Sequence, residues 1–430
     1  MYIAPAVQLS PLANHRTLSV NASVYAFCAY TFVQQFIKRL GGEYFALERI
    51  LQDFRQKIHI EDAMKNRISV LMQTLRQRLL SGRYTPEFIW QEICKNHELV
   101  SLLYAHFAHK HLTPAQKNKY PNLVASLGPE LDSAAVLDQI SSKASDENVK
   151  HIFEMFVNFN DHIIKTNFHS EKKAAIAFRL NPQFLHSEEF PTRPFGIFLV
   201  LGVYFQAYHV RFRDIARGGI RLICSRDAAA YHYNRHTLFE ENYNLAFTQQ
   251  NKNKDIPEGG SKGAILLHLD KQGSEYYKTT AFKHYVDGLL DLLLSERHNS
   301  EEIAHIQEEV LFLGPDEGTA DLMDWASSHA HQRGYIYWKA FTTGKSKGGI
   351  PHDRFGMTTR GVRAYVQGIY DKLKLDETTI TKCQTGDAVD LLCHDNNTLA
   401  RWTRWRLRKQ RNPPFIGTHC CSSRWQWSLV

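Results

Sequence analysis

The sequence predicts an α/β fold with a largely parallel sheet, preceded by an α-helical N-terminal region. Two observations lead to this prediction. Over residues 22–110, segments such as SVYAFCAYTFVQQFIKRL and MKNRISVLMQTLRQRLL place apolar residues three or four positions apart, which is the periodicity of a helix with one buried face. From residue 174 onward, short apolar runs alternate with longer helical patterns, and this alternation is typical of a parallel sheet whose strands are joined by helices.

The individual elements follow from local signals. In the N-terminal region Pro86 suits the first turn of a helix, residues 111–131 carry loop signals, and a further helix is expected over 146–160. In the second region we expect strands at 174–180, 197–212 (as a pair), 264–269 and 308–314, and helices near 234–250, 281–296 and 319–333.

Composition narrows the class of protein. The chain has 430 residues, 43% hydrophobic and 22% charged, which is ordinary for a soluble globular protein. Its apolar runs are shorter than the roughly 18–20 residues of a membrane span, and its N-terminus lacks the pattern of a secretory signal. The seven cysteines show neither a disulfide framework nor metal-ligand spacing. We therefore expect an intracellular protein, cytoplasmic or mitochondrial, without a metal site.

The net charge of +8 suggests nucleic-acid binding, but its distribution argues against it. Residues 401–430 hold seven basic residues and no acidic one, so the other 400 residues carry a net charge of only +1. Four of the seven tryptophans also lie in this tail. Arginine and tryptophan together can bind single strands by charge and stacking, so weak nucleic-acid binding through the tail is the alternative interpretation.

Three glycine-containing segments combine charge with close backbone approach, as a site for a small anionic substrate requires. In ARGGIR, Arg217 and Arg221 flank Gly218 and Gly219. In DIPEGGSKG, Lys262 follows Gly259 and Gly260 and is expected just before a strand, with Lys252 and Lys254 near enough in sequence to lower its pKa.

In LGPDEGTADLMDW, Asp316 occupies a turn after a strand. Each segment taken alone also fits a purely structural role. The two glycine pairs fit surface turns with solvated cations, and Asp316 fits a helix N-cap.

Taken together, these segments resemble one family. HVRFRDIARGGIR, TLFEENYNLAFTQQNKNKDIPEGGSKG, LGPDEGTADLMDWA and TGKSKGGIPHDRFGMTTRGVRAYV occur in this order within about 195–386, and they are similar to the large, fungal-type NAD-specific glutamate dehydrogenases. The resemblance implies oxidation of L-glutamate to 2-oxoglutarate and ammonium with NAD as cofactor, and homo-oligomers in the intact family.

The resemblance also assigns residues. Lys262 falls on the catalytic lysine that activates water, and Asp316 on the aspartate that moves the amine proton. Arg217, with the two glycine pairs Gly218, Gly219, Gly259 and Gly260, falls on the substrate-binding segments. The second substrate lysine falls on Gln250 by strict spacing, so Lys252 is assigned as its replacement. Thr359 and Arg360 lie where relatives face the nicotinamide.

The resemblance stops after TKCQTG at 381–386, where the family continues GGPDGDLGSNEI and a dinucleotide-binding (Rossmann) domain. If the reading frame is shifted by one base, each tryptophan codon becomes a glycine codon. From Arg401 onward, codons that are compatible with the given residues then encode GGPDGDLGSNEILLS. We therefore interpret 387–430 as an out-of-frame, disordered tail, and expect the Rossmann domain to be missing.

The predicted domains are a helical remnant at 1–165, a substrate-binding domain at 170–386, and this tail. We expect the chain to be inactive by itself. As an alternative it is a non-catalytic fragment that associates with full-length subunits.

Overall fold

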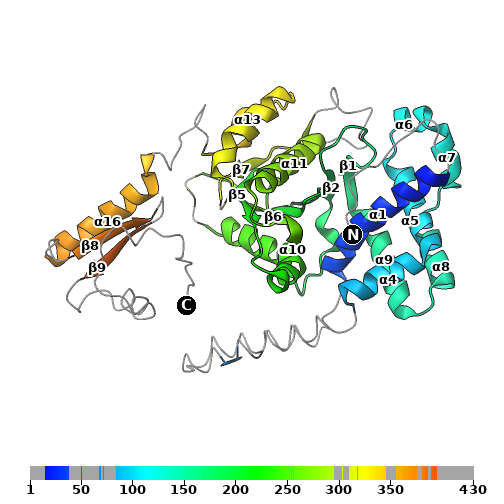
Figure 1. Cartoon of the computed structure of the whole chain (residues 1–430), viewed down its shortest axis with the longest axis horizontal. Coiled ribbons are helices and arrows are strands. Elements are labelled where there is room, and N and C mark those ends of the chain that lie inside the picture. Colours follow the sequence, from blue (N-terminus) through cyan, green and yellow to red (C-terminus); the bar gives the residue numbers. More distant parts are fainter. Residues whose placement is uncertain are drawn as a thin grey trace. The chain divides into compact units, whose positions relative to one another are not determined.

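The computed structural model describes residues 15–37, 50, 67–68, 71, 84–252, 254, 256–294, 303, 309–316, 318–344, 355–374, 380–385 and 389–394 (Figure 1). The chain divides into two compact units, Met1–Thr343 and Gly344–Val430. Within the described residues, no helix combines the length and the apolar character needed to cross a membrane. The helix expected over MKNRISVLMQTLRQRLL, residues 64–80, falls almost wholly outside these residues.

The first part of unit 1 is helical, as predicted. Its described helices are α1 (His15–Phe36), α4 (Pro86–Lys95), α5 (His97–His111), α6 (Pro114–Lys119), α7 (Pro121–Leu127), α8 (Ser133–Lys143) and α9 (Glu147–His162). The helix starts at Pro86 and near residue 146 are confirmed, because Thr85 and Asp146 accept hydrogen bonds from the first-turn amides.

The loop predicted at 111–131 is wrong, because two short helices lie there. Thr113 and Gln116 form a reciprocal cap at the start of α6, and a proline occupies the first turn of both α6 and α7. The prolines that suggested a loop therefore begin helices.

The second part of unit 1 is a seven-stranded sheet in the order β1-β2-β3-β4-β6-β5-β7. The strands are β1 (Ile163–Thr166), β2 (Ile176–Leu180), β3 (Gly196–Leu201), β4 (Phe205–Arg211), β5 (Ala216–Ile223), β6 (Gly259–Leu267) and β7 (Phe312–Gly314). The α/β class is confirmed, but the prediction of a largely parallel sheet is wrong. Neighbours from β1 to β4, and β4 with β6, are antiparallel, whereas β5 pairs in parallel with β6 and β7. Short connections between β1, β2, β3 and β4 permit antiparallel neighbours, and only the later strands are joined by helices.

Two long helices cover opposite faces of this sheet (Figure 1). Helix α10 (Ala228–Gln250) packs with α1 and the helical region in one buried cluster, which also contains Tyr208 and Ala264 of the sheet. Helix α11 (Glu275–Leu293) packs on the other face, with Ile220 and Ile265. After β7 the chain enters η3 (Ala320–Leu322), α13 (Met323–Gln332) and α14 (Trp338–Phe341).

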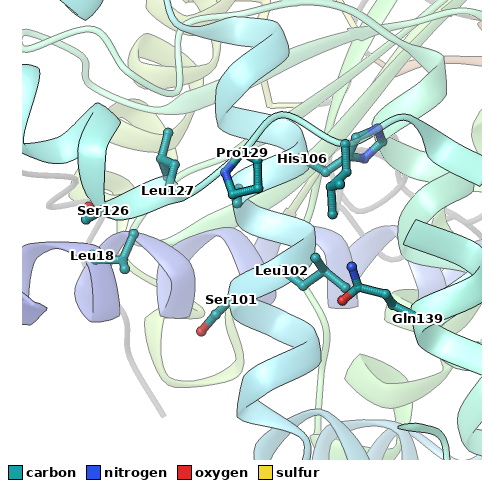
Figure 2. A pocket seen from close by; sticks show the side chains of 10 residues that line it. Leu18, Ser101, Leu102, His106, Ser126, Leu127, Pro129 and Gln139 are labelled. Carbon is teal, nitrogen blue, oxygen red and sulfur yellow. The ribbon is translucent and has the colours of Figure 1, made fainter. Parts of the chain in front are cut away.

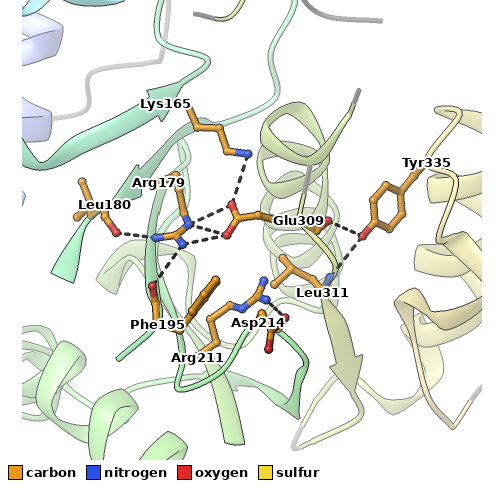
Figure 3. Close-up of polar contacts among 9 residues, drawn as sticks. All are labelled: Lys165, Arg179, Leu180, Phe195, Arg211, Asp214, Glu309, Leu311 and Tyr335. Atoms are coloured by element: carbon orange, nitrogen blue, oxygen red, sulfur yellow. Dashed lines mark hydrogen bonds and ion pairs between the residues drawn. The ribbon is translucent and has the colours of Figure 1, made fainter. Parts of the chain in front are cut away.

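A buried network of ion pairs joins β1 and β2 to the segment just before β7 (Figure 3). The Glu309 carboxylate, just before β7, accepts hydrogen bonds at 2.9 and 3.0 Å from Nε of Arg179 in β2, and it lies 3.4 Å from Nζ of Lys165 in β1. Tyr335 donates to the carbonyl of Glu309 at 3.0 Å. Side chains of Lys165, Arg179 and Glu309 are 1%, 6% and 8% exposed, so these charges are shielded from water.

Unit 2 contains a helix and a hairpin among its described residues. Helix α16 (Met357–Leu373) is followed by β8 (Ile380–Thr385) and β9 (Val389–His394), which pair antiparallel. Strand β9 lies within the segment interpreted from the sequence as a tail, and the remainder of that segment lies outside the described residues.

Candidate active site

The side chains of Lys262 and Asp316, which are 54 positions apart in sequence, are in contact on the face of β5 that carries Gly219. Lys262 belongs to β6, and Asp316 follows directly after β7, on the other side of β5. The Lys262 ammonium donates a hydrogen bond to Oδ2 of Asp316. Their side chains are 12% and 25% exposed, so the ion pair is partly shielded but open to solvent. The sequence placed Lys262 in a loop before the strand; the structure places it inside β6, on a rigid element.

Gly219 of β5 makes this contact possible. The β5–β6 register, which pairs Arg217 with Gly260 and Ile220 with Gly263, sets Gly219 beside Lys262. A Cβ atom at position 219 would lie 2.9 Å from both Cβ and Oδ2 of Asp316. Because any side chain here would occupy the space of the carboxylate, glycine leaves the path between the lysine and the aspartate open.

Gly218 serves a different purpose, on the opposite face of the strand. A Cβ atom there would lie 1.5 Å from the carbonyl oxygen of Ser261, which is a backbone atom and cannot turn aside. The ARGGIR segment is therefore not a surface turn. It is a central strand whose two glycines let β5 approach β6 on one side and Asp316 on the other.

We expect Gly218→Ala to lower the free energy of unfolding by more than about 3 kcal/mol, because the added methyl group forces β5 away from β6. Urea unfolding followed by circular dichroism measures this. Gly368→Ala is the matched control, since nothing lies within 4 Å of that position in α16 and alanine favours helices. Equal stability of the Gly218→Ala variant and the parent chain would contradict the close approach.

Arg217 lies on the same face of β5, two residues before Gly219. Its guanidinium forms an ion pair with Oε1 of Glu258 at 2.9 Å, and Nζ of Lys254 lies 3.4 Å from the same oxygen. Lys254 also donates to the carbonyl of Gly259 at 2.8 Å. Arg217 is 42% exposed whereas Glu258 is 6% exposed, so a buried carboxylate holds an accessible arginine at the edge of the site. Lys252, assigned to the substrate from the sequence, is exposed, and the lysine that reaches this cluster is Lys254.

Gly259 and Gly260 fit the start of β6 against the end of α10. The side-chain oxygen of Gln250 accepts a hydrogen bond from the Gly260 amide at 2.7 Å. A Cβ atom at Gly260 would lie 2.0 Å from the Gln250 amide nitrogen, and one at Gly259 would lie 2.7 Å from Cβ of Arg213. Gln250, where family spacing expects a lysine, thus anchors the loop that leads to Lys262.

The turn after β7 is held by the Thr319 hydroxyl and not by the Asp316 carboxylate. The Asp316 amide donates to the hydroxyl of Thr319 at 3.0 Å, and this hydroxyl donates to the carbonyl of Ile220 at 2.7 Å. Thr319, not Asp316, is the N-cap residue of η3. The N-cap alternative for Asp316 is therefore wrong, and its side chain extends to Lys262 instead.

The two residues assigned to the nicotinamide lie in unit 2, at the start of α16. Arg360 is exposed, and the side chain of Thr359 is outside the described part of the chain. Arg221, beyond Gly219 on β5, lies 3.4 Å from Glu241 of α10. No group of three or more His, Cys, Asp or Glu side chains suited to a metal ion occurs among the residues that the structure describes.

A cavity of about 320 Å³ lies elsewhere, among the helices of unit 1 (Figure 2). Leu18, Leu102, His106, Leu127 and Gln139 are among its lining residues, and it includes none of the residues named above. The cavity is therefore separate from the Lys262–Asp316 pair, and sequence patterns gave no sign of it.

In chemical terms, the paired lysine and aspartate can exchange a proton with a bound substrate, and Arg217 can bind a carboxylate. Lys262 and Arg217 lie on the adjacent strands β6 and β5, and Asp316 lies in the turn after β7, the next strand in the sheet. Placement on strands holds Lys262 and Arg217 more firmly than placement on loops would.

Comparison with known proteins gives a consistent result. The family model described as "Bacterial NAD-glutamate dehydrogenase, catalytic domain" matches residues 133–392. The chain is 44% identical to glutamate dehydrogenase 2 of Dictyostelium discoideum and 42% identical to the NAD-specific glutamate dehydrogenase of Neurospora crassa, over 90% of its own length in both cases. It spans only 35% and 36% of those two proteins.

A crystal structure of glutamate dehydrogenase from Peptoniphilus asaccharolyticus covers 48% of the chain at 15% identity, with a TM-score of 0.28, too low to define the fold. The family match is decisive by itself, since it includes all the strands of unit 1 and both members of the Lys262–Asp316 pair. The chain belongs to the family of the NAD-glutamate dehydrogenase catalytic domain.

Proposed function

We propose that unit 1 supplies the substrate-binding and proton-transfer groups of an NAD-dependent glutamate dehydrogenase. The reaction converts L-glutamate, oxidised NAD and water into 2-oxoglutarate, ammonium, NADH and a proton. The observation that carries this proposal is the ion pair of Lys262 with Asp316, on the face of β5 and β6 that also carries Arg217.

Each residue has a role set by its chemistry. Arg217 binds a substrate carboxylate, since its guanidinium is accessible and Glu258 fixes its direction. Lys262 donates to the developing carbonyl oxygen and takes the proton from the water that attacks the imine carbon. Asp316 accepts a proton from the substrate ammonium group and returns one to the departing amine.

When bound, NAD would accept the hydride from Cα of glutamate. Thr359 and Arg360 are the residues of this chain that we propose to face it. Among the described residues, no strand, glycine-rich turn and helix follow one another in the dinucleotide-binding pattern. The described residues alone therefore do not account for nucleotide binding, and we propose that the 430-residue chain binds substrate without turning it over.

We expect the purified chain to bind 2-oxoglutarate, and Arg217→Met to weaken this binding roughly 10- to 100-fold, since a charge-assisted hydrogen bond contributes about 1.5–3 kcal/mol. Isothermal titration calorimetry measures both affinities. Arg193→Met is the control, because Arg193 is exposed. Unchanged affinity in Arg217→Met would remove that residue from the proposed site.

With glutamate and NAD, we expect the same purified chain to produce no NADH above the rate of a sample without protein. The reason is that the substrate must be held about 3–3.5 Å from the nicotinamide for hydride transfer. Absorbance of NADH measures the rate. Steady NADH formation that depends on both glutamate and the chain would contradict this expectation, because it would show that the 430-residue chain binds the nucleotide without any further domain.

A further inference from the structure

Three buried polar groups lie under the candidate site, on the face of β4 and β6 that is opposite Lys262. Nη1 of Arg211, Oγ of Ser261 and Nε2 of His209 have no hydrogen-bond partner among the described residues. The three residues are 1%, 0% and 0% exposed. Such groups are normally satisfied, because an unpaired buried donor costs about 1–3 kcal/mol.

The strand register brings these groups together. In the antiparallel β4–β6 pair, Arg211 is directly opposite Ser261, and His209 is opposite Gly263. Directly opposed side chains point to the same face with Cβ atoms about 4.5–5.5 Å apart. Arg211, Ser261 and His209 therefore share one face, while Lys262 points to the other.

The remaining atoms of these side chains are already engaged. Nε of Arg211 donates to the carbonyl of Arg213 at 3.2 Å, and its Nη2 donates to the carbonyl of Asp214. Nδ1 of His209 lies 2.9 Å from the hydroxyl of Tyr285 on α11. One guanidinium nitrogen, one hydroxyl and one ring nitrogen thus have no partner among the described residues, and their side chains share one face of β4 and β6.

The surroundings also carry excess positive charge. Lys165, Arg179 and Arg211 gather near the buried carboxylate of Glu309, and the other described carboxylate that acts on Arg211 is the exposed one of Asp214 (Figure 3). Burial lowers the pKa of Arg211 to about 10, although Glu309 acts in the opposite direction. The centre of the Phe195 ring lies 5.2 Å from the Arg211 guanidinium and 5.8 Å from that of Arg179, so the ring attracts both cations but carries no negative charge that would neutralise them.

We propose that Arg211 and Ser261 bind one small monovalent anion, of the size of chloride, beneath the strand that carries Lys262. Such an anion accepts hydrogen bonds from Nη1 of Arg211 and from the Ser261 hydroxyl, and it offsets buried positive charge. A water molecule would satisfy the donors but not the charge. A dianion would cost more to desolvate in so buried a place.

The proposed anion would stabilise two segments of the candidate site: the turn between β4 and β5, and strand β6. Arg211 holds the carbonyls of residues 213 and 214, in the turn that precedes Arg217. Ser261 is the residue immediately before Lys262. Anion binding would therefore order the β4–β5 turn and β6 together, and this inference does not depend on which reaction the site catalyses.

Chloride titration at constant ionic strength tests the proposal, with methanesulfonate as the replacing anion and urea unfolding as the readout. We expect the unfolding midpoint of the parent chain to rise saturably with chloride, because a ligand that binds only the folded state stabilises it. Ser261→Ala should weaken the apparent chloride affinity roughly tenfold or more. Ser142→Ala, an exposed serine of α8, should leave it unchanged.

Two results would overturn the proposal. One is the same midpoint in chloride and methanesulfonate for the parent chain; the other is an unchanged chloride response in Ser261→Ala. Crystals grown with bromide give an independent measurement that does not rely on stability. An anomalous peak beside Nη1 of Arg211 supports the site, and its absence contradicts it.

Discussion

Replacing Lys262 with methionine is expected to lower kcat for glutamate oxidation by about 10²–10⁴-fold, the range typical for loss of a positioned proton donor or acceptor. The assay needs a protein that turns over. A chimera in which residues 84–343 of this chain replace the matching segment of the Dictyostelium relative provides one, since the two chains are 44% identical. Methionine keeps the length and apolar stem of lysine and removes only the ammonium group.

The structure gives two ways to separate catalysis from folding in that experiment. Lys172→Met removes an exposed lysine and should leave kcat unchanged. Because Lys262 and Asp316 act as a pair, Asp316→Asn should also lower kcat, and the double variant should lose much less than the product of the two single effects. If Lys262→Met keeps more than about one tenth of the parent kcat, the proposed proton transfer is wrong.

Replacing Glu309 with glutamine is expected to lower the free energy of unfolding by about 3–5 kcal/mol, the usual cost of breaking a buried ion pair from one side. The variant leaves Lys165 and Arg179 without their shared carboxylate, and both side chains are nearly inaccessible to water. Denaturant unfolding measures the loss. Glu154→Gln on α9, whose carboxylate is 38% exposed beside His151, is the control and should change stability by less than about 1 kcal/mol.

The same network predicts a pH dependence. Burial alone would raise the pKa of Glu309, but Arg179, Lys165 and Arg211 together hold it below its ordinary value. A carboxyl group with a lowered pKa contributes stability that is complete above its unfolded pKa, about 4.3, and is lost as pH falls through its folded pKa. The parent chain should therefore lose more stability than Glu309→Gln on acidification below about pH 4.3. Parallel curves for the two proteins would contradict this.

Local signals in the sequence predicted most elements but not how they assemble. Apolar runs located β2, β3 and β4, and the helical period located α10 and α11, because both depend on residues close in sequence. Strand direction was missed because it depends on which strands become neighbours, and the chain inserts β6 between β4 and β5. Strand β5 was missed because Gly218 and Gly219 disfavour strands locally, and only contacts with Ser261 and Asp316 explain them.

The residues of the candidate site were also only partly predictable from the sequence, because some of their contacts depend on how the chain folds. Motif resemblance assigned Lys262, Asp316 and Arg217 to the site, and the structure brings Lys262 of β6 into contact with Asp316 in the turn after β7. Resemblance and spacing did not identify Glu258, which holds Arg217 and Lys254, because a glutamate before two glycines has no distinctive pattern. They also favoured Lys252 over Lys254, since the burial of one lysine and the exposure of the other depend on the folded loop.

A crystal structure of the chain with 2-oxoglutarate would show whether Arg217, Lys262 and Asp316 form one substrate site. We expect a ligand carboxylate in contact with Arg217 and the keto oxygen within hydrogen-bond distance of Nζ of Lys262, with Asp316 beside it. A ligand bound in the cavity between Leu18 and Gln139, away from all three residues, would contradict it.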